Sequence, residues 1–154
     1  MTTAEAPQPS FQIEKIYVKD LSLELPNAPQ IFMQNENPQL EIQVRNEGQK
    51  FSDVLYEVIV TVTVTAKVGE KTLFLAEAAQ AGIFALRDIP EADIGPVLGI
   101  ACPNILYPYV REAISDLVTR GGFPPVILAP VQFETLYAQR NPVQPAAPGL
   151  ANAN

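Results

Sequence analysis

The stretch 58–65 constrains the fold of this chain more than any other part of the sequence. Valine occupies every even position, while Ile59 and three threonines occupy the odd positions. β-Branched side chains favour extended backbone, and the side chains of a strand alternate between its two faces. A turn at Gly69 and Glu70 follows, and a second apolar run extends over 71–86. The sequence therefore predicts a hairpin of two long strands.

The segment 11–25 predicts another strand, which is long and bent. Its apolar residues change phase twice: Phe11 and Ile13, then Ile16 and Val18, then Leu21, Leu23 and Leu25. Because the side-chain period of a strand is two, each change of phase requires a bulge or a bend. In the last part of this strand, Asp20, Ser22 and Glu24 should lie on the face opposite the leucines.

A polar loop over 26–38 separates this strand from the next one. The loop is too long for a tight hairpin, yet it carries Ile31, Phe32 and Met33, so we expect it to pack against another element. The alternation over 40–45 predicts a strand, and the residues Asn-Glu-Gly at 46–48 are typical of a turn that ends it.

After Pro90 the apolar period changes from two to that of a helix. Paired apolar residues recur every four positions over 104–120, which predicts one amphipathic helix with Asn104 as its N-cap and Gly121 and Gly122 as its stop. A second, shorter helix is expected around 133–140. Strands in the first part and helices in the second predict an α+β fold with segregated elements.

The length of 154 residues fits one domain, which we place at 11–140, between a disordered leader at 1–10 and a disordered tail at 141–154. The net charge of −7 argues against a nucleic-acid ligand, which calls for clustered Lys and Arg. No apolar stretch approaches the ~20 residues of a membrane-spanning helix, so we expect a soluble protein that stays in the compartment where it is made.

The composition excludes most enzyme chemistry. The chain has no histidine and a single cysteine, Cys102, so one subunit cannot build a disulfide, a His or Cys zinc site or a Ser-His-Asp triad. Cys102 precedes Pro103 among apolar neighbours and is expected to be buried and unreactive. The carboxylate pairs at 91 and 93 and at 112 and 116 are typical of a solvated surface. We expect no catalytic residues, no cofactor and no metal.

Two features of the apolar residues point to binding. The strands and helices offer more apolar faces than one four-stranded sheet and two helices can cover, which suggests burial between subunits. In addition, Met and aromatic residues gather on the loop and on the last helix, as on adaptable binding surfaces: Ile31, Phe32, Met33, Phe133, Leu136 and Tyr137. Taken singly, each of these residues is explained at least as well by ordinary core packing.

Several co-linear segments together resemble the SecB family of bacterial protein-export chaperones. They are FQIEKIYVKDLSLELPNAP at 11–29, YEVIVTVTVTA at 56–66, TLFLAEAAQAGIF at 72–84, CPNILYPYVRE at 102–112 and GGFPPVILAPVQFETLY at 121–137. The resemblance implies a four-stranded antiparallel Greek-key sheet with two main helices on one side. It also implies a homotetramer built as a dimer of dimers, and a cytoplasmic, ATP-independent holdase that delivers unfolded secretory precursors to the translocation ATPase SecA.

The family's functional residues carry over by position. The resemblance assigns SecA binding to Asp20, Glu24, Leu75 and Glu77, an acidic patch that would attract the basic, zinc-bearing tail of the ATPase, with the zinc belonging to that partner. It assigns client binding to an apolar groove formed by Phe32, Met33, Leu40, Ile42, Val44, Phe133, Leu136 and Tyr137. It places Ile105, Tyr109, Ile114 and Leu117 in the oligomer interface. Glu36, where relatives often have an aromatic residue, and an uncharged tail after Arg140 depart from the family pattern.

Two other functions remain open at this stage. The groove could hold a small apolar ligand, which would make the protein a carrier. Alternatively, a chaperone of the same fold could serve a single partner such as an antitoxin; the retained SecA-binding residues argue against this, because a dedicated chaperone would not need them.

Overall fold

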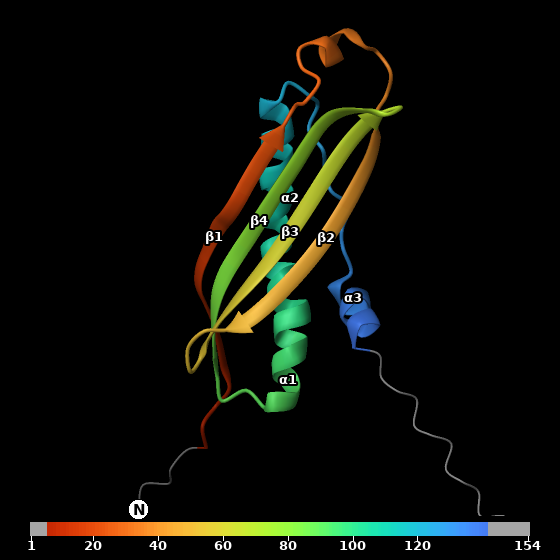
Figure 1. Cartoon of the computed structure of the whole chain (residues 1–154). Coiled ribbons are helices and arrows are strands. Elements are labelled where there is room, and N and C mark those ends of the chain that lie inside the picture. Colours follow the sequence, from red (N-terminus) through yellow and green to blue (C-terminus); the bar gives the residue numbers. More distant parts are fainter. Residues whose placement is uncertain (1–5, 142–154) are drawn as a thin grey trace, which may run out of the picture.

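The computed structural model describes residues 6–141 and consists of one antiparallel sheet with helices on one of its sides (Figure 1). The elements are β1 (Ser10–Glu24), a 3-10 turn η1 (Gln30–Met33), β2 (Gln39–Lys50), β3 (Leu55–Val68), β4 (Lys71–Arg87), α1 (Glu91–Pro96), a π-helical segment η2 (Val97–Ala101), α2 (Cys102–Arg120) and α3 (Phe133–Arg140). Most of the predicted leader and tail lie outside the described residues. No helix within residues 6–141 is both long and apolar enough to cross a membrane.

The four strands lie in the order β1-β4-β3-β2, and every neighbouring pair is antiparallel. Two hairpins connect β2, β3 and β4, and the long crossover after β1 brings the chain from one edge of the sheet to the other. This is Greek-key order. The predicted fold class is confirmed, including the long β3–β4 hairpin that turns at Gly69, where φ is +60°.

The two predicted bulges of β1 are confirmed. The pairing of β1 with β4 shifts register between Ile13 and Lys15 and again between Val18 and Asp20, the two places where the apolar phase changes. Each shift keeps most of the apolar side chains of this strand on the side that carries the helices. The last part of β1 therefore presents its acidic residues on the other side.

The predicted end of the second strand is wrong. β2 continues to Lys50, and residues 46–48 pair with residues 58–60 of β3 instead of turning. Pairing along the whole length of β3 satisfies their backbone groups, and this outweighs the local preference of Asn and Gly for turns. The turn lies at residues 51–54, where the backbone N–H of Phe51 donates to the carbonyl of Leu55 at 3.0 Å.

The predicted start of the long helix is also wrong. The helical backbone begins at Glu91 and runs through α1 and η2 into α2, so Asn104 lies inside a helix and caps nothing. Glycines and prolines at 95, 96, 99 and 103 lower the intrinsic helix preference of this stretch. The apolar pattern therefore did not predict that the helix begins at Glu91. Packing against β2 and α3 stabilises it instead.

The predicted stop of α2 is confirmed. Gly122 has a φ of +86°, and its N–H donates to the carbonyl of Thr119 at 3.0 Å. The N–H of Phe123 reaches back to the carbonyl of Val118 at 3.3 Å. These two bonds form a Schellman motif, which ends the helix and turns the chain back along α2 toward α3.

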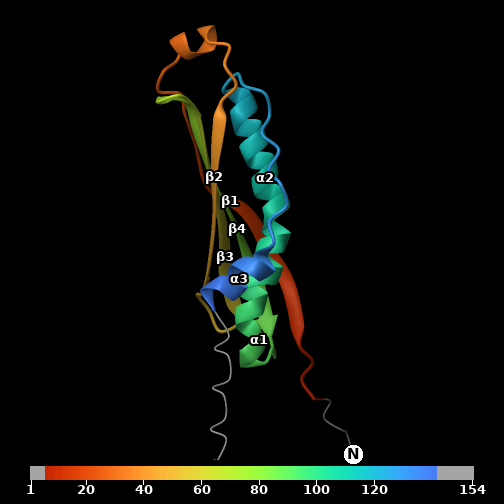
Figure 2. The same cartoon turned by 90° about the vertical axis from the view of Figure 1, so that its right-hand side faces the viewer.

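The core lies between the sheet and α2, and Figure 2 shows that the helices cover only this side of the sheet. Fully buried side chains of both layers meet there: Val58, Val60, Val62, Val64, Phe84, Leu106, Val110, Ile114 and Val118. Cys102 is buried in the same core, and burial raises the pKa of its thiol to about 12. The predicted burial of this cysteine is confirmed.

Candidate functional site

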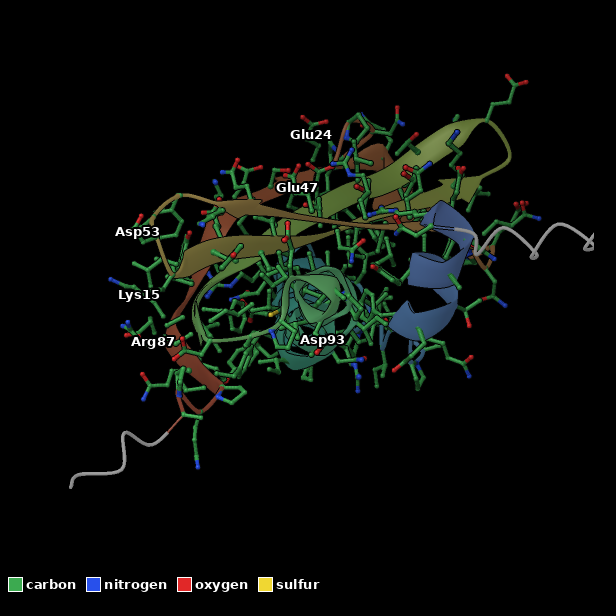
Figure 3. All side chains as sticks on the ribbon, turned by 90° about the horizontal axis from the view of Figure 1, so that it is seen from below. Lys15, Glu24, Glu47, Asp53, Arg87 and Asp93 are labelled. Carbon is green, nitrogen blue, oxygen red and sulfur yellow. The ribbon has the colours of Figure 1, made fainter. Side chains whose placement is uncertain are left out.

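The uncovered face of the sheet carries the four residues assigned to SecA binding. In the β1–β4 register, Ser22 lies opposite Glu77 and Glu24 lies opposite Leu75, while Asp20 pairs with Ala79. Alternation places all of these side chains on the side away from the helices. Figure 3 shows Glu24 and Glu47 on this side and Asp93 of α1 on the other. We refer to Asp20, Glu24, Leu75 and Glu77 as the acidic patch.

Glu77 has two partners that the sequence analysis did not identify. The hydroxyl of Thr63, which lies directly opposite Glu77 on β3, donates to its Oε2 at 2.8 Å. The Nη2 of Arg45, which reaches diagonally from β2, lies 3.9 Å from the same oxygen. These partners hold the Glu77 carboxylate in place. Because the side chain is 34% exposed, the carboxylate also remains accessible to a binding partner.

A second polar cluster on the same face surrounds Glu57 of β3. Its carboxylate accepts hydrogen bonds from Tyr17 Oη, from Lys19 Nζ at 2.8 Å and from Gln49 Nε2 at 3.4 Å. The hydrogen bonds from Lys19 and Tyr17 lower the pKa of Glu57. Burial, together with the bond to Glu57, raises the pKa of Tyr17 to about 12. Because its donors come from β1 and β2, this cluster ties both edge strands to β3.

The residues assigned to client binding lie at the β2 edge of the sheet and around it. Leu40 and Ile42, each 45% exposed, and the partly buried Val44 share the helix-side face of β2. In the crossover loop, Phe32 stacks on Phe123 at 5.4 Å. Met33 is 84% exposed and is therefore the most accessible of the assigned side chains.

The last helix supplies fewer accessible side chains than the assignment expects. Phe133 is fully buried and packs edge-on against Tyr107, with ring centroids 5.8 Å apart, so its side chain belongs to the core. Leu136 and Tyr137 are partly buried. The ring of Tyr137 lies against Gly95 and Gly99, which anchors α3 to the helical run before α2. Helical spacing alone could not separate anchoring residues from exposed ones.

The four residues assigned to the oligomer interface divide between the core and the surface. Ile114 is fully buried and Leu117 nearly so, and both face the sheet of their own subunit. In the single chain these two side chains therefore belong to the core, and their assignment to an interface stays a prediction. Ile105 is partly buried, and Tyr109 is half exposed on the outer side of α2.

Apolar surface that the sequence analysis did not assign lies along β1. Phe11, Ile13, Val18 and Leu21 are all exposed, and all lie on the helix-side face of this edge strand. The sequence predicted a surplus of apolar faces but did not place it on this strand. Exposed apolar side chains that gather along one strand are typical of an interaction surface.

The fold carries two surfaces of different chemistry that suit the binding of other molecules. Among residues 6–141 no group of three or more His, Cys, Asp and Glu side chains is arranged to hold a metal ion. An acidic patch occupies one face of the sheet, and an apolar surface follows the edge of the other face.

The chain belongs to the SecB family: the model of "Preprotein translocase subunit SecB" matches residues 4–144. Its relatives include "Protein-export protein SecB" of Chromobacterium violaceum, 56% identical over 96% of this chain and 98% of that protein. The same protein of Methylobacillus flagellatus is 58% identical over 95% and 93%. That of Neisseria gonorrhoeae is 55% identical over 93% and 98%.

A solved structure with the same fold is the SecB-like chaperone of Mycobacterium tuberculosis, in complex with a ChAD peptide from the HigA1 antitoxin. It superposes with a TM-score of 0.65, covers 79% of this chain and 91% of that chain, and is 18% identical. At this identity the likeness supports the fold alone.

Proposed function

We propose that this chain is an ATP-independent, cytoplasmic holdase that keeps secretory precursors unfolded and delivers them to SecA. The observation that carries the proposal is the separation of an acidic patch and an apolar surface onto opposite faces of one sheet, in a chain whose relatives are protein-export proteins. Its work is binding, so it needs no catalytic group.

The apolar surface supports client binding. Leu40 and Ile42 on the β2 edge, together with Phe32 and Met33 on the crossover, offer flexible and aromatic side chains in an exposed setting. Apolar burial is non-directional, so such a surface binds many unfolded segments without sequence specificity. Folded proteins bury such segments and should not bind. Phe133 serves this surface only indirectly, as the buried first residue of α3, which anchors this helix to the core.

The acidic patch supports SecA binding. Leu75 and the three carboxylates lie in a row along the β1–β4 pair, on a face that no helix of residues 6–141 covers. Such a row suits a basic protein segment with one apolar anchor. The proposed segment is the basic, zinc-bearing tail of SecA. Zinc would arrive with that partner.

Exposed apolar surface supports assembly into a tetramer, built as a dimer of dimers. The apolar residues of β1 and the outer side of α2 at Tyr109 lie uncovered in the single chain. Several exposed apolar side chains along one strand are typical of a subunit that buries them against further copies of itself.

The proposal is tested with a purified secretory precursor, presented either freshly diluted from denaturant or fully folded, with the mass of the complex measured by light scattering. We expect tight binding of the unfolded form only, at the mass of four subunits plus one client. Binding of neither form would overturn the export function in favour of a dedicated-partner chaperone. A stoichiometric small molecule released on extraction would instead indicate a carrier.

Two variants separate the surfaces. Glu77→Lys should weaken SecA binding at least tenfold and leave precursor binding within twofold, because it reverses one charge of the patch without touching the apolar surface. Glu91→Lys, the same charge change on exposed α1, is the matched control and should leave both unchanged. Equal loss of both activities in Glu77→Lys would contradict two distinct sites.

A further inference from the structure

We infer that Arg45 competes with SecA for Glu77, and that Thr63 is a positioning residue that orients the Glu77 carboxylate for the incoming cation. The inference rests on the proposed SecA-binding function of the acidic patch. It adds two residues to that site and gives one of them the role of limiting affinity.

The four strands place one row of side chains across the open face at this point. Ser22 of β1, Glu77 of β4, Thr63 of β3 and Gln43 of β2 lie directly opposite one another in successive pairs. Arg45 stands two residues further along β2, on the same face. Its guanidinium therefore reaches Glu77 from across β3, from the side away from the other acids of the patch.

Thr63 fixes the carboxylate. Its hydroxyl donates to Glu77 Oε2 at 2.8 Å, and a β-branched side chain in a central strand has few other rotamers. Among the described residues, the other carboxylate oxygen, Oε1, accepts no side-chain hydrogen bond. One oxygen is thus engaged and the other is available, so a partner's cation meets an acceptor whose orientation is already set.

Arg45 holds Glu77 more loosely. Its Nη2 lies 3.9 Å from Oε2, and its side chain is 63% exposed, so the pair is long and hydrated. Such pairs contribute little to stability and exchange readily. A basic segment that binds Glu77 must displace Arg45 or accept its repulsion at close range. Arg45 also offsets one of the three negative charges of the patch.

The test is a set of dissociation constants for a zinc-loaded peptide of the SecA C-terminal tail, measured by isothermal titration calorimetry with the full-length chain. At 50 mM NaCl, Arg45→Gln should tighten binding about threefold and Arg45→Glu still further, because an exposed ion pair of this kind shifts an equilibrium by only a few-fold. The gain should shrink at 300 mM NaCl, where charges are screened over a shorter distance.

Thr63 has a paired test. Thr63→Val keeps the shape of the side chain and removes the hydroxyl, and should weaken binding about threefold. Thr63→Ser restores the hydroxyl and should return binding to within twofold of the unmodified protein. Thermal unfolding of each variant checks that the fold is intact.

Controls separate this inference from the function beneath it. Arg120→Gln removes an arginine from another exposed ion pair, with Asp116 on α2, and should have no effect. In a Glu77→Gln background, the gain from Arg45→Gln should fall below 1.5-fold, because the carboxylate for which Arg45 and the peptide compete is absent. If Glu77→Gln weakens binding but Arg45→Gln does not tighten it, the inference is overturned and the function stands. If the unmodified protein does not bind the peptide, both are overturned.

Discussion

At the scale of single residues, the surroundings of Cys102 and Glu57 set the protonation state of each side chain. Cys102 opens α2 inside the core, and burial alone raises the pKa of its thiol to about 12. Only the thiolate reacts with disulfide reagents, so the native thiol is doubly protected, by its surroundings and by its charge state. Cys102 therefore acts as a small apolar residue that fills space in the core.

We expect Cys102 in the native protein to be unreactive toward Ellman's reagent at pH 8 over an hour. In 6 M guanidinium chloride one thiol per chain should react at once. The measurement is the absorbance of released thionitrobenzoate. Rapid labelling without denaturant would mean that the core opens around the start of α2.

Glu57 is the opposite case, a carboxylate that its surroundings keep charged. Hydrogen bonds from Lys19 and Tyr17 lower its pKa in the folded chain below the ordinary value of 4.5. A lowered pKa stabilises the fold fully above the unfolded-state pKa, and this stabilisation is lost as the pH falls through the folded-state pKa. The cluster should therefore loosen in acid.

Glu57→Gln tests this pH dependence. The variant should be less stable than the unmodified chain at pH 7. The difference should begin to shrink below pH 4.5, where the unfolded chain binds a proton at Glu57 that the folded chain still excludes, and it is lost as the pH falls through the lowered folded-state pKa. Urea unfolding at pH 7 and pH 3.5 gives the two differences. Glu70→Gln, in the exposed β3–β4 turn, should change stability little at either pH. A difference that stays constant with pH would refute a role for the charge.

The residues of the acidic patch could be predicted from the sequence, but their partners could not. Period two alone places Asp20, Ser22 and Glu24 together, as the family resemblance also implies. The bonds from Thr63 and Arg45 to Glu77 depend on the register of three strands. A shift in pairing between Ala66 and Lys67 alters that register, and nothing in the local pattern announces it.

At the scale of elements, type could be predicted and boundaries could not. Each strand and both main helices were expected, because their apolar periods are clear. The extension of β2 to Lys50 and the helical run from Glu91 were missed. In both places residues with poor local preference adopt regular structure because neighbouring elements pair with them or pack on them.

The docking of α3 depends on one of these missed places. This helix has eight residues, too few to be stable alone, and Tyr137 fixes it against Gly95 and Gly99. A Cβ added at Gly99 would lie 2.9 Å from Tyr137 Cε2, so a larger residue must push α3 away.

Gly99→Val should therefore displace α3 and weaken precursor binding several-fold, while SecA binding stays within twofold. The overpacking cost of about 1–3 kcal/mol exceeds the gain of roughly 0.4 kcal/mol in helix preference from Gly to Val. Precursor affinity and thermal unfolding are the measurements. Gly48→Ala, where an added Cβ meets only ordinary contacts at 3.5 Å, is the matched control. Unchanged precursor binding in Gly99→Val would remove α3 from the client surface.

At the scale of the whole molecule, the sheet separates two kinds of physical interaction. Binding at the acidic patch on the open face should depend on charge, and binding at the helix-side edge should depend on the burial of apolar surface. Salt screens the first and leaves the second intact or slightly stronger.

Raising NaCl from 50 to 300 mM should weaken SecA binding about tenfold and change precursor binding less than twofold. Titrations of both partners against the same preparation measure this directly. Equal salt sensitivity of the two affinities would show that charge contributes to client capture as well.

The uncovered side of the sheet has a consequence for the order of events during delivery. A client held at the β2 edge leaves the atoms of the acidic patch free, because the sheet lies between them. Occupancy of the two proposed sites is therefore not mutually exclusive, and a ternary complex of chaperone, precursor and ATPase is sterically permitted. Docking of the tail on the proposed patch does not displace the client by direct contact. Transfer of the precursor then depends on the affinity of the ATPase for the precursor, relative to that of the chaperone, within the ternary complex.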